Sequence, residues 1–106
     1  MLSSPISAAA SGPNTIVPAQ TGRRIRVLGF LLSGAGAVNV TWQDGAANNL
    51  SGLLTIAGAG GTITAPIAPP LVGSELYWMI GATSQALVLN LSAAVGVGGM
   101  VVWDYI

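Results

Sequence analysis

Apolar residues occur along the chain in short runs that alternate with polar or small residues, and glycine or proline separates one run from the next. Runs of about six to nine residues have the length of β-strands. No window keeps the i, i+3, i+4, i+7 spacing of an amphipathic helix through three turns, whereas a period of two recurs. The pattern therefore predicts an all-β protein with little room for helices.

The alternation places about eight strands along the chain, at spacings of about 10 to 15 residues, which is typical of a β-sandwich or a small barrel. Eight strands in two antiparallel sheets indicate a jelly-roll-like β-sandwich. The predicted strands are residues 14–19, 24–33, 38–43, 50–57, 61–66, 74–82, 86–91 and 95–106.

One domain is expected, because 106 residues are too few for two independent cores. We assign residues 14–106 to a single β-sandwich domain. Residues 1–13 are small, uncharged and rich in Ser and Ala, which predicts an N-terminal arm that is ordered only where it packs on something else. The first predicted strand, 14–19, contains Pro18 and is therefore expected at the edge of a sheet.

The predicted strand 24–33 has apolar side chains on both faces if its alternation is strict. Such a strand is expected at the centre of a sheet. A glycine-containing turn over residues 33–36 connects it to residues 38–43, which predicts a β-hairpin. Alternation assigns Arg24, Arg26, Leu28, Phe30 and Leu32 to one face and Ile25, Val27, Gly29 and Leu31 to the other.

Proline and tryptophan mark two further features. Residues 66–70 contain three prolines, which cannot donate along a ladder, so we expect a connection there rather than a strand. Trp42, Trp78 and Trp103 each have apolar neighbours two positions away, and this phase favours packing in the core over stacking on a sugar.

Composition adds a prediction about assembly. Hydrophobic residues make up 52% of the chain and charged residues 6%, the formal net charge is zero and the mean hydropathy is +0.72. An ordinary domain carries about 25% charged residues. A sandwich needs only its inner faces to be apolar, yet several predicted strands lack a polar outer face. We therefore expect an obligate homo-oligomer, a trimer ahead of other closed forms; the alternative is a monomer whose Ala and Gly raise the hydropathy.

The same composition excludes most site chemistry. The chain has no Cys and no His, which rules out Ser-His-Asp and Cys-His triads and His- or Cys-based metal sites, and we expect no cofactor. Its carboxylates are Asp44, Glu75 and Asp104. Glu75 and Asp104 could form a glycosidase pair only beside a polar cleft, which few residues here could build. We therefore expect a protein that is not an enzyme.

Nucleic-acid and membrane partners are also disfavoured. Three arginines and no lysine cannot neutralise a run of phosphates. The longest apolar stretch, residues 27–38, is shorter than the roughly 20 residues of a membrane-spanning helix. Residues 1–11 lack the basic start of a secretory signal peptide.

The three arginines, Arg23, Arg24 and Arg26, are the candidate partner contacts. They lie within four residues, directly before or at the start of the most apolar predicted strand. Charges in this place commonly protect a strand from aggregation. The alternative is a salt bridge to a partner protein, or to Asp44, Glu75 or Asp104 of a neighbouring copy.

Four stretches carry a wider similarity: RIRVLGFLLS at 24–33, GAVNVTW at 36–42, LSG at 50–52 and LVLNLSAAV at 87–95. In these stretches the chain resembles a group of small structural proteins of tailed bacteriophages. The shared pattern covers most of the chain after Thr21 and consists of strand patterns rather than catalytic signatures. The proline-rich segment 66–70 and the very low charge depart from it.

The resemblance implies a compact β-sandwich that serves as a virion component. We expect a homotrimeric decoration or cement protein on the surface of a capsid assembled in the host cytoplasm. Its partners would be its own copies and the major capsid protein or another virion protein. The alternative is the tip of a tail or head fibre, acting as a receptor- or carbohydrate-binding module.

Overall fold

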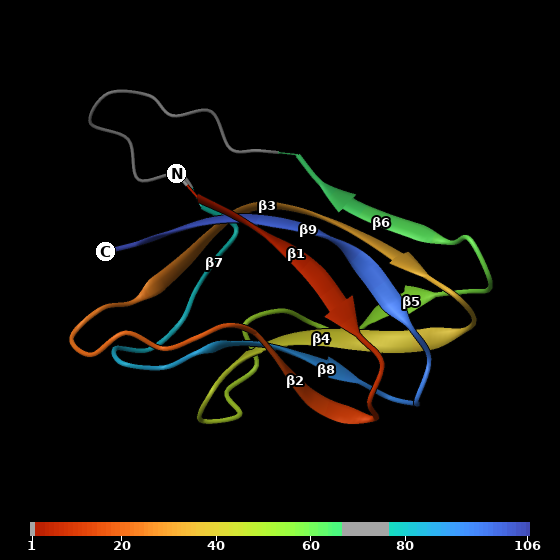
Figure 1. The fold of residues 1–106 in the computed structure, drawn as a ribbon, viewed down its shortest axis with the longest axis horizontal. Helices are drawn as coiled ribbons and strands as arrows, with labels where there is room; N and C mark the ends of the chain where they lie inside the picture. The colour runs from red at the N-terminus through yellow and green to blue at the C-terminus, as the bar shows by residue number, and fades with distance from the viewer. Residues whose placement is uncertain (1, 67–76) are drawn as a thin grey trace.

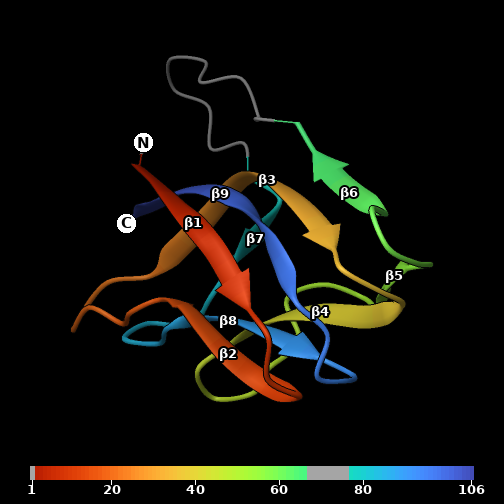
Figure 2. The ribbon, with the colours of Figure 1, turned by 45° about the vertical axis from the view of Figure 1, so that its right-hand side comes forward.

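The computed structural model describes residues 2–66 and 77–106, whose nine strands form two antiparallel sheets packed face to face (Figures 1 and 2). The predicted all-β sandwich is confirmed, and the described residues contain no helix. The strands are β1 (Leu2–Ala8), β2 (Gly12–Val17), β3 (Ile25–Gly34), β4 (Val38–Asp44), β5 (Leu54–Ile56), β6 (Thr62–Ala65), β7 (Met79–Ile80), β8 (Leu87–Leu91) and β9 (Val97–Tyr105).

The strand order is that of a jelly roll. Sheet A has the order β1-β9-β3-β6, with the two-residue β7 also paired to β3, and sheet B has the order β2-β8-β4-β5. The chain passes from one sheet to the other after β1, β2, β3, β5, β7 and β8, so most paired strands are distant in sequence. Eight of the nine strands thus make up the two four-stranded sheets that are typical of jelly rolls.

The predicted hairpin of β3 and β4 is wrong, because the two strands lie in different sheets. The turn between them instead carries the chain from sheet A to sheet B. At its start the Ala35 N–H still donates to the Gly96 carbonyl, at 2.8 Å, which extends the pairing of β3 with β9. The edges of β3 are already occupied by β9 on one side and by β6 and β7 on the other.

The expected arm over residues 1–13 is also corrected by the structure. Residues 2–8 form β1, which pairs along its whole length with β9, and β2 begins at Gly12. Ile6 and Ala8 are buried in the core. An edge strand needs only one partner and one apolar face, so a segment with few large apolar residues can still be ordered here.

A β-bulge in β3 changes the predicted assignment of its faces. Val27 lies opposite Trp103 and Gly29 lies opposite Val102, so that Leu28 is an extra residue in the ladder. A bulge shifts the alternation by one position. The inward-facing set is therefore Ile25, Val27, Phe30 and Leu32, whereas Leu31 faces outward and is 45% exposed. The predicted central position of β3, between β9 and β6, is confirmed.

Two predicted strands are much shorter than expected. Of residues 50–57 only Leu54–Ile56 forms a strand, because the Leu50 N–H turns to the Trp42 carbonyl at 2.7 Å. Of residues 74–82 only Met79–Ile80 does so, while 74–76 lie outside the described residues. The predicted proline-rich connection also lies outside them, except for its first residue.

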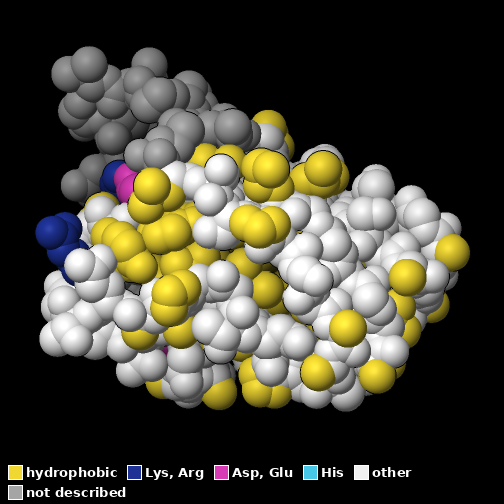
Figure 3. Space-filling view, in the orientation of Figure 1, with side chains coloured by type: hydrophobic (Ala, Val, Ile, Leu, Met, Phe, Trp, Pro, Cys, Tyr) yellow, Lys and Arg dark blue, Asp and Glu magenta, His cyan; other side chains and the backbone are white. Residues whose placement is uncertain are grey.

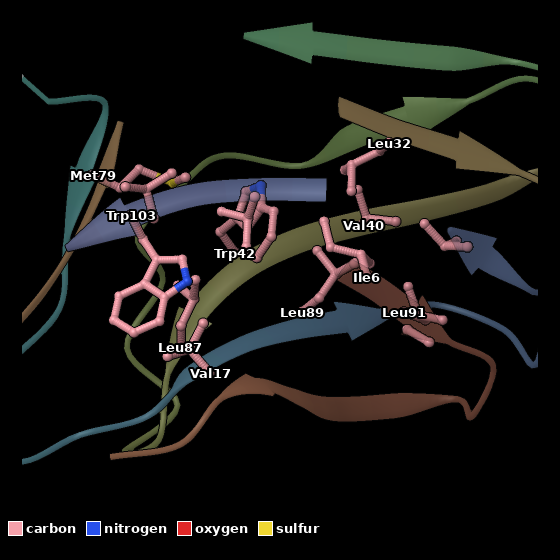
Figure 4. Packing of buried hydrophobic residues seen from close by; sticks show 14 of the residues in the cluster. Ile6, Val17, Leu32, Val40, Trp42, Met79, Leu87, Leu89, Leu91 and Trp103 are labelled. Carbon is pink, nitrogen blue, oxygen red and sulfur yellow. The ribbon is translucent and has the colours of Figure 1, made fainter. Parts of the chain in front are cut away.

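The core lies between the two sheets (Figure 4). Trp42 of β4 is fully buried, and its ring packs against Phe30 of β3 with centroids 5.4 Å apart. Trp103 of β9 is 7% exposed, and its Nε1–H donates to Ser4 Oγ at 2.9 Å. The prediction of core packing is confirmed for these two tryptophans, whereas Trp78 is 52% exposed and contradicts it.

Candidate docking surface

The outer face of sheet A carries an apolar surface at its centre. Leu31 of β3 and Met100 of β9 lie opposite each other and are 45% and 50% exposed. Pro5 of β1 lies opposite Met100 on the other side and is exposed, and Val102 of β9 is partly exposed. We call Pro5, Leu31, Met100 and Val102 the apolar band. It contains no charged or hydrogen-bonding side chain.

Local sequence explains why these side chains face outward. The bulge at Leu28 turns Leu31 away from the core, because the residues on either side of it face inward. Met100 alternates with the fully buried Val101, and Pro5 alternates with the buried Ile6. The band is therefore a consequence of register, and an undisturbed alternation would have placed Leu31 on the same face as Val27.

The band borders a depression that Gly29 and Phe30 also line. This shallow depression of about 270 Å³ lies between Leu31, Met100, Val102 and Pro66. Such a depression fits an apolar side chain of a partner better than a polar ligand, since its walls offer almost no hydrogen-bonding side chains.

The outer face of sheet B has a different chemistry. Asn39, Thr41 and Gln43 alternate along β4 with buried residues and are partly exposed. Side-chain amides bond to one another across this face: Asn90 Nδ2 donates to Gln43 Oε1 at 3.2 Å, and Gln43 Nε2 donates to Asn49 Oδ1 at 2.8 Å. One face of the sandwich is thus apolar at its centre and the other is polar but uncharged.

The three candidate arginines gather at one end of the molecule, the left end in Figure 3. Arg26 forms a two-point ion pair with Asp104 of the same chain, with Nε–Oδ1 at 2.8 Å and Nη2–Oδ2 at 2.7 Å. Arg24 Nε donates to the Gly81 carbonyl at 2.8 Å. Arg23 is exposed, and its side chain makes no hydrogen bond or ion pair to the described residues.

This arrangement separates the roles of the arginines. Arg26 and Asp104 are a directly opposed cross-strand pair, so both already have an opposite charge within the chain. Arg23 and Arg24 keep guanidinium groups that can reach a partner. The sequence places the three arginines within four residues. It does not indicate that Asp104, 78 positions from Arg26, lies on the neighbouring strand.

Asp44 is the third acidic residue of the prediction and lies at the end of β4, only 2% exposed. Burial raises its pKa, but hydrogen bonds from the Asn48 side chain and from the backbone N–H groups of Asn48, Ala46 and Ala82 outweigh this and lower the pKa below its ordinary value of 3.8. The Ala46 and Asn48 N–H groups both donate to Oδ1 at 3.0 Å. Asp44 therefore holds a loop and is not available to a partner. Glu75 lies outside the described residues.

Sequence reasoning missed two exposed aromatic residues. Trp78 and Tyr77 are 52% and 42% exposed, and Trp78 Nε1 donates to the Pro66 carbonyl at 2.8 Å. Trp78 and Met79 border a second shallow hollow, of about 330 Å³, beside Phe30 and other apolar residues. Alternation predicts which residues share a face of a strand. Because β7 is only two residues long and begins after Trp78, alternation does not determine where this side chain points.

The described part of the chain holds no group of three or more His, Cys, Asp or Glu residues that could bind a metal ion. It also holds no helix with the length and apolar character needed to cross a membrane. The chain matches no family model, no curated protein and no solved structure. The exposed surface of the sandwich is therefore the guide to its function.

Proposed function

We propose that the protein is a non-enzymatic structural component of a phage virion, a capsid decoration or cement protein that acts as a homotrimer. The apolar band on sheet A is the observation that carries this proposal. Exposed apolar side chains that lie together on a rigid sheet are characteristic of protein-docking surfaces. The resemblance to small structural proteins of tailed phages supplies the virion context.

In this proposal the apolar surface of the sandwich, with the band at its centre, contacts both neighbouring copies of the chain and the shell protein. A net charge on this surface would oppose contact between copies of one chain, and the band carries none. Contact would remove Leu31 and Met100 from water, and side chains of a second copy could enter the hollow over Gly29. The Arg26–Asp104 pair neutralises itself beside the band and so does not oppose the approach of another copy.

Burial of apolar surface supplies the binding free energy. At about 25 cal/mol per Å², a standard interface of about 1,600 Å² gives a large gross term, from which the cost of association is subtracted. Few charges take part, so the contact is expected to be insensitive to salt. Arg23 and Arg24 lie at one end of the sandwich and offer an additional, salt-sensitive contact to the major capsid protein or another virion protein.

The proposal is tested on purified virions. We expect the protein to co-purify with the shell protein in a fixed copy number and to stay bound at about 1 M NaCl, because apolar contacts are not screened. Electron microscopy of the same particles should show it on the capsid surface. Release by salt would contradict the apolar mechanism, and absence from the particle would contradict the virion role.

A carbohydrate-binding fibre tip is the second candidate, and the exposed pair Tyr77 and Trp78 is the observation that favours it. Aromatic rings that stack on sugars must be accessible, as these are. Trp42 and Trp103 are buried, so Trp78 would report binding. A change of tryptophan fluorescence on adding glycans, abolished by Trp78→Phe, would support this function against the first.

A further inference from the structure

Two edge strands on the same side of the sandwich each contain a proline. Among the residues that the structure describes, Pro5 lies within β1, which pairs only with β9, and Pro13 lies within β2, which pairs only with β8. Figures 1 and 2 show β1 and β2 on the same side, one in each sheet. The free side of an edge strand has unpaired N–H and C=O groups that can pair with a strand of another molecule.

The hydrogen bonds of β9 show which way the backbone of Pro5 points. Successive residues of a central antiparallel strand turn their N–H and C=O groups to one neighbour and then to the other. Ile106 exchanges both bonds with Arg24, at 2.9 and 3.0 Å, and Gly96 accepts from Ala35. Even-numbered residues of this segment therefore turn to β3, and Met100 is one of them. Pro5, opposite Met100, must turn its backbone nitrogen to the free edge.

The backbone of β2 is oriented in the same way. The Ser92 N–H donates to the Asn39 carbonyl at 2.9 Å, so Ser92 turns to β4. Asn90, two positions earlier, turns the same way. Pro13 lies opposite Asn90, and its nitrogen therefore also lies at the free edge. Both prolines occupy positions where an N–H would be offered to another molecule.

We propose that Pro5 and Pro13 prevent edge-to-edge pairing of the sandwich with other copies, so that the protein associates through its sheet faces. Proline removes one N–H from each free edge, at the middle of β1 for Pro5 and at the second residue of β2 for Pro13. Charged side chains are another common protection of edges, and neither β1 nor β2 contains one. On the opposite side, β5 and β6 have only three and four residues, and short edges pair poorly. The protection of the edges does not depend on the proposed function, whereas association through the sheet faces rests on it.

The direct test restores the missing N–H groups. The double variant Pro5→Val/Pro13→Thr, in which Val restores the N–H and keeps the apolar band apolar, is compared with the wild type and with Pro18→Thr, which changes an exposed proline outside any strand. Sedimentation velocity over a range of concentrations should show at least about a doubling of the weight-average mass of the double variant over the wild type, with an infrared band of intermolecular β-structure. Pro18→Thr should match the wild type. A folded double variant that sediments as the wild type would overturn the proposal.

Amide hydrogen exchange of the wild type tests the register without any substitution. The N–H groups of Ser3 and Ser7 should exchange rapidly, because they share the orientation of Pro5. Those of Ser4 and Ile6 should be protected by bonds to β9. Protected Ser3 and Ser7 amides would show that this edge is paired, and would overturn the proposal even if the double variant failed to fold.

Discussion

Asp44 keeps its charge beside the core because hydrogen bonds replace the water that burial removes. Two backbone N–H groups bind Oδ1, and Asn48 Nδ2 binds Oδ2 at 3.1 Å. These bonds favour the ionised form, which is why the pKa of Asp44 is lowered in spite of burial. A carboxylate held in this way stabilises the folded chain and fixes the loop after β4.

Replacement of Asp44 by Ala should destabilise the protein by about 2 kcal/mol at neutral pH, because it leaves several donors without an acceptor. The negative charge of Asp44 contributes to the free energy of unfolding. This contribution is fully present above the ordinary Asp pKa of 3.8 and is lost as the pH falls through the lowered pKa of the folded state. Urea unfolding at several pH values measures both effects. If the unfolding free energies of wild type and variant differ as much at pH 2 as at pH 7, the charge of Asp44 does not contribute to stability.

The tryptophans show how far single residues can be predicted. Trp42 and Trp103 lie on strands of seven and nine residues, so their phase relative to apolar neighbours correctly indicates the core. Trp78 has the same apolar neighbours in sequence but precedes a strand of two residues. Its exposure depends on packing that no local pattern describes.

At the scale of the elements, β3 and β9 form the centre of sheet A, and Gly99 allows their close approach. Gly99 has a φ of +145°, and a Cβ there would overlap the carbonyl oxygen of Leu31. Gly99→Ala should therefore destabilise the fold by about 3 kcal/mol.

Gly58→Ala is the matched control, because a Cβ at Gly58 meets no atom within 4 Å. It should change the unfolding free energy by less than about 0.5 kcal/mol. Urea denaturation of both variants measures the difference. Equal stability of the two would mean that the contact of β9 with β3 is looser than the structure shows.

Sequence patterns located most strands of this fold, and the errors have physical causes. The phase of β3 was wrong because an extra residue at Leu28 leaves no mark in composition. β1 was missed because Ser, Pro and Ala dominate it, and only pairing with β9 orders it. The apolar band depends on both features, and so it could not be predicted from the sequence.

At the scale of the whole molecule, one copy is as compact as a monomer of its size. Its accessible surface is 5385 Å², against about 5,400 Å² expected for this mass. An excess of accessible surface is therefore not a reason to expect assembly. The observation that favours assembly is the group of exposed apolar side chains on the outer face of sheet A, and the poorly pairing edges would direct association to that face.

Sedimentation velocity of the wild type and of Leu31→Gln/Met100→Gln, at low salt and at about 1 M NaCl, tests the central claim most directly. Leu53→Gln is the control, since Leu53 is 66% exposed and lies outside the band. We predict a trimer for wild type and control at both salt concentrations, and a folded monomer for the double variant. A monomeric wild type at micromolar concentration, or a double variant that remains trimeric, would contradict it.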